Sequence, residues 1–432
     1  MRDFSAAVGN YLNGVAALDA VRSVFFVSAT ALIWISDHPF YSLQGLTFGE
    51  TERSAASTYV VFGAMAFLGL SLGWRNGSAL RTLLIPSSIL FGAWMTFNIA
   101  SSHNSGVSLI RFLLTASGML LASSLLLVPK SRAELNQGLI IAALVLLFLC
   151  YVGVALAPDL STHTAKDIQE PHLAGDWRGT FGHKNAAGPM MAMLVFIGIY
   201  LTRCGAITTG PLITVLAALF LVFSGSKSSI ALCIGVLLLA GIVKLFRSFA
   251  WRAMTCFVPL IIMNLLGVGT AVSPGLAEVA KHLPFDATYS GRDEVWKFSF
   301  DSLRGHVLMG YGYAAFWGSD PSTTKMTDEG SEWTVEAASS HNGYLDVTLT
   351  LGLPGLLLVV LICVVSPLKN FQIANLHGDD SFLADLFLQI WLLGIYLSST
   401  ESFFLNRVDP SWLTFLIAVF GLHYLARFPF RA

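Results

Sequence analysis

Charged side chains are scarce in this chain of 432 residues. Lys, Arg, Asp and Glu together make up 12% of it, whereas a soluble domain carries roughly 25%. Hydrophobic residues make up 55%, and they come in runs of roughly 17–22, the length of a helix that spans a bilayer core. The composition therefore excludes an ordinary soluble globule and predicts an all-α polytopic membrane protein.

Other absences narrow the function. The chain has no Gly-x-x-x-x-Gly-Lys-Ser/Thr loop, which excludes ATP-driven transport by this chain alone. It has no Asp-x-Asp pair, which argues against a metal-dependent transferase that uses nucleotide sugars. Apart from Arg111, charges are nearly absent from the apolar runs, whereas ion-coupled transporters usually bury several. A net charge of −1 gives no sign of nucleic-acid binding, and five cysteines do not form a disulfide framework.

Apolar runs between charged or turn-rich breaks predict twelve spanning helices, give or take one. They are expected at 18–36, 58–74, 82–100, 107–128, 138–157, 186–202, 210–223, 229–246, 251–272, 343–366, 383–400 and 410–427. No signal-peptide cleavage pattern follows the first run, so we expect a retained span. Residues 1–157 would hold the N-terminal spans, 158–272 the central spans with a cation-rich loop, 273–342 a large outward loop, and 343–432 the C-terminal spans.

The loop charges predict the orientation. If both termini are cytoplasmic, the cytoplasmic segments carry thirteen Lys and Arg residues and the short outward loops only six, as the positive-inside bias requires. Eight of the ten histidines then lie outside. Two outward segments, 158–185 and 273–342, are long enough to hold a site, so we expect the working side to be the outer face.

Two cation-bearing turns are candidate anion sites. In the segment 175–185, Arg178, His183 and Lys184 lie among glycines, and Asn185 is placed to cap the helix that follows. Arg, Lys and a helix N-terminus together favour phosphate. Lys227, in the turn 224–229, is a further phosphate contact. The alternatives are an interfacial anchor with an ordinary cap for the first turn, and a lysine that snorkels to the headgroups for the second.

Two further clusters lie in and after the large loop. A helix is expected from Ser290 to about Leu303, with Arg292, Trp296 and Ser299 on one face. It would hold Arg292 over a lipid pyrophosphate, or lie on the membrane with Trp296 at the interface. His341 follows at the outer mouth of the tenth span, beside Asn342. Histidine accepts protons near neutral pH, although a satisfied interfacial histidine is the alternative.

At these four clusters the sequence resembles the O-antigen ligase and polymerase superfamily of bacterial envelope glycan enzymes. The family's Arg-Gly-x-Phe-x-His-x-Asn, Ser-x-Ser-Arg, Gly-Arg-x-x-x-Trp and His-Asn-x-x-Leu segments match 178–185, 224–228, 291–296 and 341–345, followed by a Gly-Leu-x-Gly match at 352–355. The resemblance covers roughly 175–365. One departure is Lys227, which stands where many members have arginine and lacks its fork of donors.

The resemblance implies a C-type glycosyltransferase architecture with neither metal nor cofactor, in the bacterial inner membrane with a periplasmic active site. The donor would be a glycan on undecaprenyl pyrophosphate, and the acceptor a glycan or lipid A–core. Arg178, Arg292, Lys227 and Lys184 would neutralise the pyrophosphate, His341 would accept the proton of the attacking hydroxyl with inversion at the anomeric carbon, and His183, Asn185, Trp296 and Asn342 would support them.

Two other classes of function compete with this interpretation. A lipid-linked glycan flippase or another polysaccharide transporter predicts a polar path with charges inside the spans. An envelope scaffold does not require cations and a histidine that converge. The separation of His341 and Arg292 in space distinguishes the enzyme from both. If the general base were another group, Glu332 and Glu336 are the next candidates.

Overall fold

The computed structural model describes residues 2–35, 38–42, 56–167, 170–282, 292–317, 339–376 and 381–428. Within these ranges the chain is helical, and its only β interaction is an isolated bridge between Thr162 and Trp177. Glu332 and Glu336, and the expected start of a helix at Ser290, lie outside the described residues.

Each of the twelve apolar runs lies on a helix. In chain order these are α1 (Arg2–Trp34), α2 (Ala56–Gly73), α4 (Pro86–Ala100), α5 (Ser105–Leu125), α6 (Arg132–Leu156), α8 (Lys184–Arg203), α9 (Thr209–Phe223), α10 (Lys227–Leu245), α11 (Phe249–Leu266), α16 (Gly343–Val359), α18 (Ser381–Leu397) and α19 (Pro410–Leu425). Among the described residues, eight helices are long and apolar enough to cross a membrane, and α9, α18 and α19 are shorter apolar helices. The chain is therefore an all-α polytopic membrane protein, while the count of twelve spans stays a prediction.

The helices differ sharply in how far other helices surround them. In the most apolar 18-residue stretch of α8, 78% of the residues are buried inside the protein. In the corresponding stretch of the span Phe249–Ala271, which contains α11, the share is 17%. The helices α18 and α19 are also buried along almost their whole length, and both pack against α8. These three helices form the centre, and α8 is buried almost throughout from Ala187 onwards.

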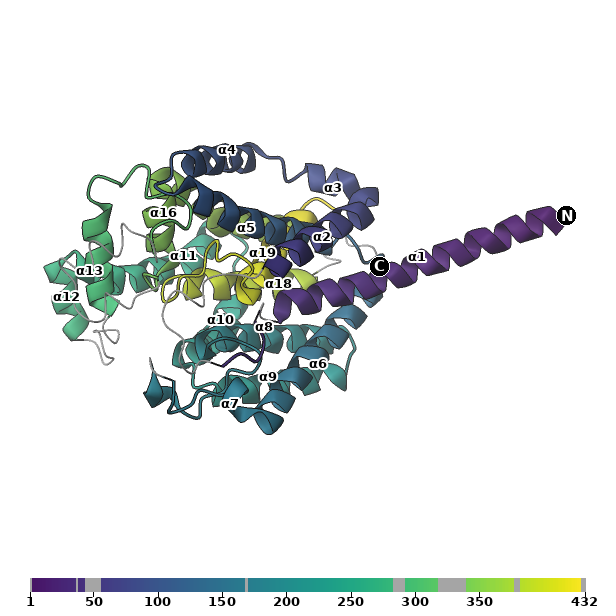
Figure 1. The fold of residues 1–432 in the computed structure, drawn as a ribbon, viewed down its shortest axis with the longest axis horizontal. Helices are drawn as coiled ribbons and strands as arrows, with labels where there is room; N and C mark the ends of the chain where they lie inside the picture. Colours follow the sequence, from purple (N-terminus) through teal and green to yellow (C-terminus); the bar gives the residue numbers. More distant parts are fainter. Residues whose placement is uncertain are drawn as a thin grey trace.

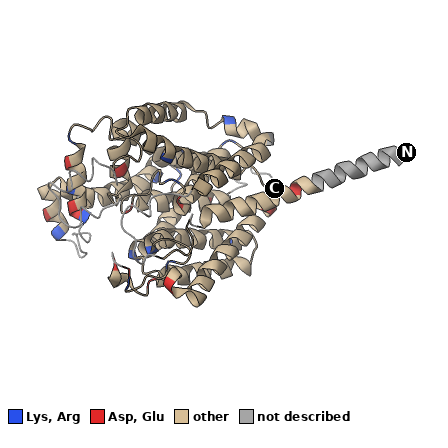
Figure 2. Cartoon of the chain, in the orientation of Figure 1, with Lys and Arg blue, Asp and Glu red and all other residues tan. Residues whose placement is uncertain are grey.

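The two ends of the molecule carry different short elements (Figure 1). At one end lie α12 (Pro274–Lys281) and α13 (Arg292–Leu303), at the other end lie α3 (Gly77–Arg81) and the two chain termini, and α7 (Pro158–Ser161) lies at the lower edge near α9. The expected end of the loop helix at Leu303 is confirmed by α13. Figure 2 shows that the helical body carries few charged residues and that many of them gather around α12, α13 and the nearby loops.

A kink in α16 gives the Gly-Leu-Pro-Gly segment at 352–355 a structural role. Gly352 lies inside the helix with a φ of 67°, and a Cβ there would fall 2.1 Å from the carbonyl oxygen of Leu308. Leu353 donates its backbone N–H to the carbonyl of Val307 at 2.9 Å. Only glycine allows both the left-handed conformation and this close contact, so the segment after α13 is held against α16. The chain then continues through the π-helix η5 (Val360–Val365) into α17 (Ser366–Leu376).

The expectation that Arg111 is nearly the only charge within the spans is wrong. Asp385, near the start of α18, is buried and pairs with Arg203 at 2.9 Å and Lys244 at 2.8 Å. Asp346, in the first turn of α16, accepts hydrogen bonds from Trp317 and Ser340 at 2.8 and 3.1 Å. Both acids lie in end turns of their helices and have partners, so they do not form a polar path through the membrane.

Candidate active site

A single carboxylate, that of Glu401, joins the most important residues expected from the sequence. Arg292 donates from Nη2 to Glu401 Oε1 at 3.0 Å, and His341 Nδ1 lies 3.2 Å from Oε2. Arg292 also donates from Nη1 to the carbonyl of Thr400. Since Arg292 and His341 contact opposite oxygens of one carboxylate, the structure places them side by side, as the enzyme interpretation requires.

Asn185 brings a third cluster to the same carboxylate. Its Nδ2 donates to Glu401 Oε1 at 3.3 Å. Arg292 begins α13, His341 precedes the cap of α16, and Asn185 is the second residue of α8. These three segments, which are far apart in the sequence, meet at Glu401 in the loop after α18.

The Glu401 carboxylate is held in its charged form. Burial by itself raises the pKa of this group, but the charge of Arg292 and the hydrogen bond with His341 outweigh burial and lower the pKa to about 2. Its side chain is 17% exposed, and that of His341 is 38% exposed. The half-buried anion thus contacts a guanidinium that is 23% exposed and a histidine that is more accessible than either.

The backbone around His341 is fixed by Asn342, the cap of α16. Asn342 Oδ1 accepts from the backbone N–H of Leu345 at 3.0 Å, and its Nδ2 donates at 3.1 Å to Asn264 Oδ1 and to the carbonyl of Ser399. His341 itself has a φ of 50°, a left-handed conformation that is uncommon for residues other than glycine. Such conformations persist where the surroundings impose them and are concentrated at functional sites.

Trp296 ties α13 to this turn. Its Nε1 donates to the carbonyl of Ser340 at 2.9 Å, and the side chain is 1% exposed. An interfacial position for Trp296 on the membrane surface is therefore wrong, because protein surrounds the ring. Trp296 instead sets the position of Arg292, which lies one turn earlier on the same helix, relative to His341.

The cap of α8 also differs from the expectation. His183, and not Asn185, caps the helix, because its Nδ1 accepts from the backbone N–H of Asn185 at 3.0 Å. His183 Nε2 lies 2.7 Å from Glu170 Oε2. His163 Nε2 accepts from the backbone N–H of Lys184 at 3.2 Å. Two histidines thus occupy the N-terminal donors of α8, which leaves the side chain of Asn185 free to reach Glu401.

The two lysines of the expected anion site lie beside this arrangement. Lys184 Nζ pairs with Asp176 Oδ2 at 2.7 Å. A Cβ at Gly225, which has a φ of 62°, would lie 2.5 Å from Asp176 Oδ1, so the turn 224–229 packs directly on that pair. Lys227 is exposed at the first residue of α10 and forms no ion pair with a described residue.

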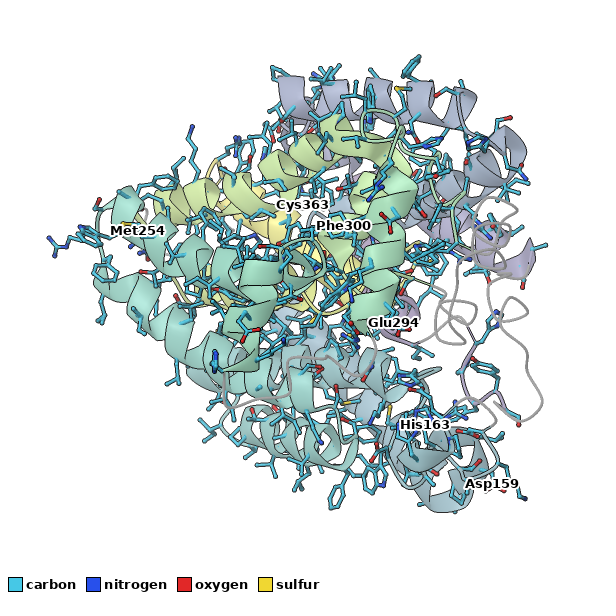
Figure 3. The ribbon with its side chains drawn as sticks, turned by 90° about the vertical axis from the view of Figure 1, so that its left-hand side faces the viewer. Asp159, His163, Met254, Glu294, Phe300 and Cys363 are labelled. Atoms are coloured by element: carbon cyan, nitrogen blue, oxygen red, sulfur yellow. The ribbon has the colours of Figure 1, made fainter. Side chains whose placement is uncertain are left out.

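Arg178 has a different environment from the other cations. It is 1% exposed, and its guanidinium donates to the backbone carbonyls of Thr162, Phe181 and Tyr41 at 3.3, 3.2 and 2.9 Å. Burial lowers the pKa of this arginine below its usual value. Three backbone partners show that Arg178 holds together the loop in which His163, His183 and Asp176 lie. Figure 3 shows this His163 loop at the opposite side of the molecule from Met254, near the start of α11.

An apolar groove reaches the site from the membrane-facing side of α11. It has a volume of about 570 Å³ and lies between α11, α13, α16 and η5. Phe257, Ile261, Phe300, Leu356 and Val360 are among its lining residues, and Figure 3 labels Phe300. Asn264 and Asn342, which bond to each other, also line it. The groove therefore runs from apolar helix faces to the backbone turn that carries His341.

The sequence interpretation missed the acids of the site. Glu401 and Asp176 pair with Arg292 and Lys184, which were expected to bind the donor, and Glu170 pairs with His183, which was expected to support them. The signal for Glu401 was its place directly after the eleventh apolar run, on the outward side where the histidines gather. No spacing within the sequence connects it to Arg292 or His341, because these contacts arise only when the loop after α18 meets the start of α13 and the turn before α16.

Residues 212–360 match the family model described as O-antigen ligase. No curated protein matches the chain at a significant level. The matched segment includes Lys227, Arg292, His341 and the kink at Gly352, while Arg178 and Lys184 precede it. The match confirms the resemblance to the O-antigen ligase and polymerase superfamily. Over the matched third of the chain the similarity is to that family, and the apolar helices indicate a multi-pass membrane protein.

Proposed function

We propose that this protein transfers a glycan from undecaprenyl pyrophosphate to a sugar hydroxyl at the periplasmic face of the inner membrane, without a metal ion. The acceptor would be a growing polysaccharide in a polymerase, or lipid A–core in a ligase. The observation that carries the proposal is the contact of Arg292 and His341 with the two oxygens of Glu401. A cation for the leaving group and a base for the attacking group are thereby held within one small site.

The donor's charge would be met by Arg292, Lys184 and Lys227. A pyrophosphate leaving group already carries its charge, so it needs fixed cations rather than a general acid. Lys227 is exposed and Lys184 is close to it through Asp176 and Gly225. Arg178 would act indirectly, by holding the loop that positions Lys184. The prenyl chain would lie in the apolar groove between α11 and α16. Asn342 is one of the residues that line this groove.

The acceptor hydroxyl would be activated by His341. With Nδ1–H donated to Glu401, Nε2 is left to take the hydroxyl proton as the oxygen attacks the anomeric carbon. The new C–O bond forms while the bond to the pyrophosphate oxygen breaks, and that electron pair leaves with the pyrophosphate. Glu401 orients the ring and stabilises the imidazolium that results, as the acid does in other carboxylate–histidine pairs. Attack opposite the leaving group gives inversion.

A transfer assay tests the proposal directly. The purified full chain is supplied with a defined glycan on undecaprenyl pyrophosphate, with a polysaccharide repeat unit and lipid A–core as competing acceptors. We expect a lengthened glycan or a glycosylated core, and the preferred product identifies the acceptor class. Donor binding and movement across vesicle membranes without any transfer would instead support the flippase.

Arg292→Lys separates the charge of Arg292 from its geometry. Arginine contacts Glu401 and the Thr400 carbonyl through two nitrogens, and a lysine has only one. The charge near Glu401 is kept, so the protein should fold, but we expect the transfer rate to fall on the order of 10²–10³-fold, the effect of losing one fixed donor to a developing anion. Arg304→Lys is the matched control, since Arg304 follows the same helix and is 84% exposed. Equal rates in both variants would remove Arg292 from the mechanism.

A further inference from the structure

Arg22 of α1 is a buried cation for which the described residues supply little compensation. The residue is 7% exposed. Its guanidinium makes one hydrogen bond to a described residue, from Nη2 to the carbonyl of Leu72 at 3.3 Å. Its Nε is buried without a hydrogen-bond partner. A buried charge without a partner is costly, so the side chain is prepared for an anion that the chain itself does not provide.

The acids near Arg22 are already engaged by Lys130, one through its side chain and the other through its backbone N–H. Asp19, one turn earlier on α1, pairs with Lys130. Glu134, in the first turn of α6, accepts the backbone N–H of Lys130 at 2.9 Å through Oε2. Neither acid forms an ion pair with Arg22. The charges in this region thus leave Arg22 as the unmatched one among the described side chains.

Two cavities meet at Arg22. One, of about 630 Å³, is lined by Arg22 and Lys130 together with the polar residues Asn76 and Ser78. The other, of about 350 Å³, lies between α1 and α6 and is lined by Arg22, by apolar residues such as Val24 and Val27, and by Glu134. Pro129 lines both cavities. A space with two cations among polar and apolar side chains therefore continues into a mostly apolar groove, with the Arg22 guanidinium at the junction.

The groove opens towards the membrane. Val24 is 65% exposed and Ile141, on the facing side of α6, is 40% exposed. Both lie on helices that are long and apolar enough to cross a bilayer. Since exposed apolar side chains on such helices are in contact with lipid, a molecule that fills both spaces would combine an anionic head with an apolar tail.

We propose that Arg22 and Lys130 bind the phosphate of an anionic phospholipid, with one acyl chain along the groove between α1 and α6. The site is separate from Glu401. Lys130 lies beside the first residues of α6, whereas the loop of the candidate active site follows Leu156, the last residue of that helix. In the expected orientation the lipid site faces the cytoplasmic leaflet, where polybasic segments meet anionic lipids. It does not depend on the proposed transferase activity. A free phosphate would satisfy Arg22 but leave the apolar groove unfilled.

Thermal unfolding of the purified full chain in a neutral detergent tests the site. The probes are phosphatidylglycerol, phosphatidylcholine with the same acyl chains, and inorganic phosphate, each titrated against the unfolding midpoint. We expect phosphatidylglycerol to act at concentrations on the order of tenfold lower than phosphatidylcholine, the worth of one hydrogen bond to a charged group. Arg22→Met should lose this preference. Arg81→Gln should keep it, because Arg81 is an exposed cation at the same end that lines neither cavity.

Each other outcome counts against the proposal. Equal effects of the two lipids on the natural protein, or a preference retained in Arg22→Met, would overturn it. A full effect of inorganic phosphate alone would show an anion site that does not need the groove. Without added lipid, Arg22→Met should be at least as stable as the natural protein, because it removes an unpaired buried charge. A lower midpoint there would mean that the chain itself compensates Arg22.

Discussion

At the scale of single residues, Glu401 decides how the site works. Its carboxylate accepts from Arg292 and Asn185 and contacts His341, and its pKa of about 2 keeps it charged at every physiological pH. A charged acid beside His341 fixes the orientation of the ring and stabilises its protonated form. The same acid opposes the charge of Arg292, so the pyrophosphate has to compete with Glu401 for that guanidinium.

A double-mutant cycle between Glu401 and His341 tests whether they act as a unit. We expect His341→Ala to slow transfer on the order of 10²–10⁴-fold, the usual contribution of a positioned base. Glu401→Gln should also slow it, and the double variant should be little worse than His341→Ala, because residues that act together give non-additive losses. Rates come from single-turnover transfer with a labelled donor.

Donor binding provides the control for that cycle. His341→Ala should bind the donor almost as well as the natural protein, and His282→Ala should leave the rate unchanged, since His282 is 79% exposed on α12. Losses of binding and rate in equal proportion would make His341 a binding or structural residue. Additive losses in the double variant would separate the two groups.

At the scale of elements, two histidines accept hydrogen bonds from the first backbone N–H groups of α8. His163 Nε2 accepts from the backbone of Lys184, and its Nδ1 lies 3.2 Å from Asp167 Oδ2. These bonds require a neutral ring that donates from Nδ1. Burial and the neighbouring His183 lower the pKa of His163 to about 4. Protonation would replace the acceptor with a second donor and release the start of the helix.

The low pKa of His163 predicts a loss of stability in mild acid. The unfolded histidine binds a proton below about pH 6.5, whereas the folded one stays neutral down to about 4. Unfolding therefore takes up a proton between these values, and stability falls as the pH is lowered from 6.5 to 4. The effect is at most ~3 kcal/mol, since one pKa unit corresponds to about 1.4 kcal/mol. Unfolding midpoints measured across this range should fall less steeply in His163→Gln, whose side-chain oxygen accepts the same N–H.

His282→Gln is the comparison for this effect. His282 is exposed, so the slope of the midpoint against pH should match that of the natural protein. If His163→Gln shows that slope as well, His163 does not carry the acid sensitivity.

At the scale of the whole molecule, charge and apolar surface are divided between regions. The helical body carries few charges, and many of those it has, of both signs, lie around α12 and α13 (Figure 2). The apolar groove of about 570 Å³ connects the lipid-facing side of α11 to this end. A lipid-linked substrate could therefore keep its tail in the membrane while its charged head reaches Arg292.

Transfer is expected to be independent of divalent cations. The pyrophosphate charge would be met by arginine and lysine, and the described residues contain no group of three His, Cys, Asp or Glu placed to hold a metal. Glu401 is already shared by Arg292 and His341. The rate in excess EDTA should equal the rate with added magnesium. A loss on chelation that magnesium or manganese restores would contradict this expectation.

The sequence by itself determined the fold class and identified candidate residues for the site. Apolar runs fix helices in a membrane because an unpaired backbone cannot be left in lipid, and every expected run lies on a helix. The motifs singled out Arg292, His341 and Asn185. Only the tertiary structure decided how they combine, because the loop after α18 brings Glu401 to the start of α8, the start of α13 and the turn before α16. It also decided that Arg178 holds a loop, that His183 caps α8 and that Trp296 is buried. A sequence reports which side chains are present, whereas partners and burial depend on contacts between segments that are distant along the chain.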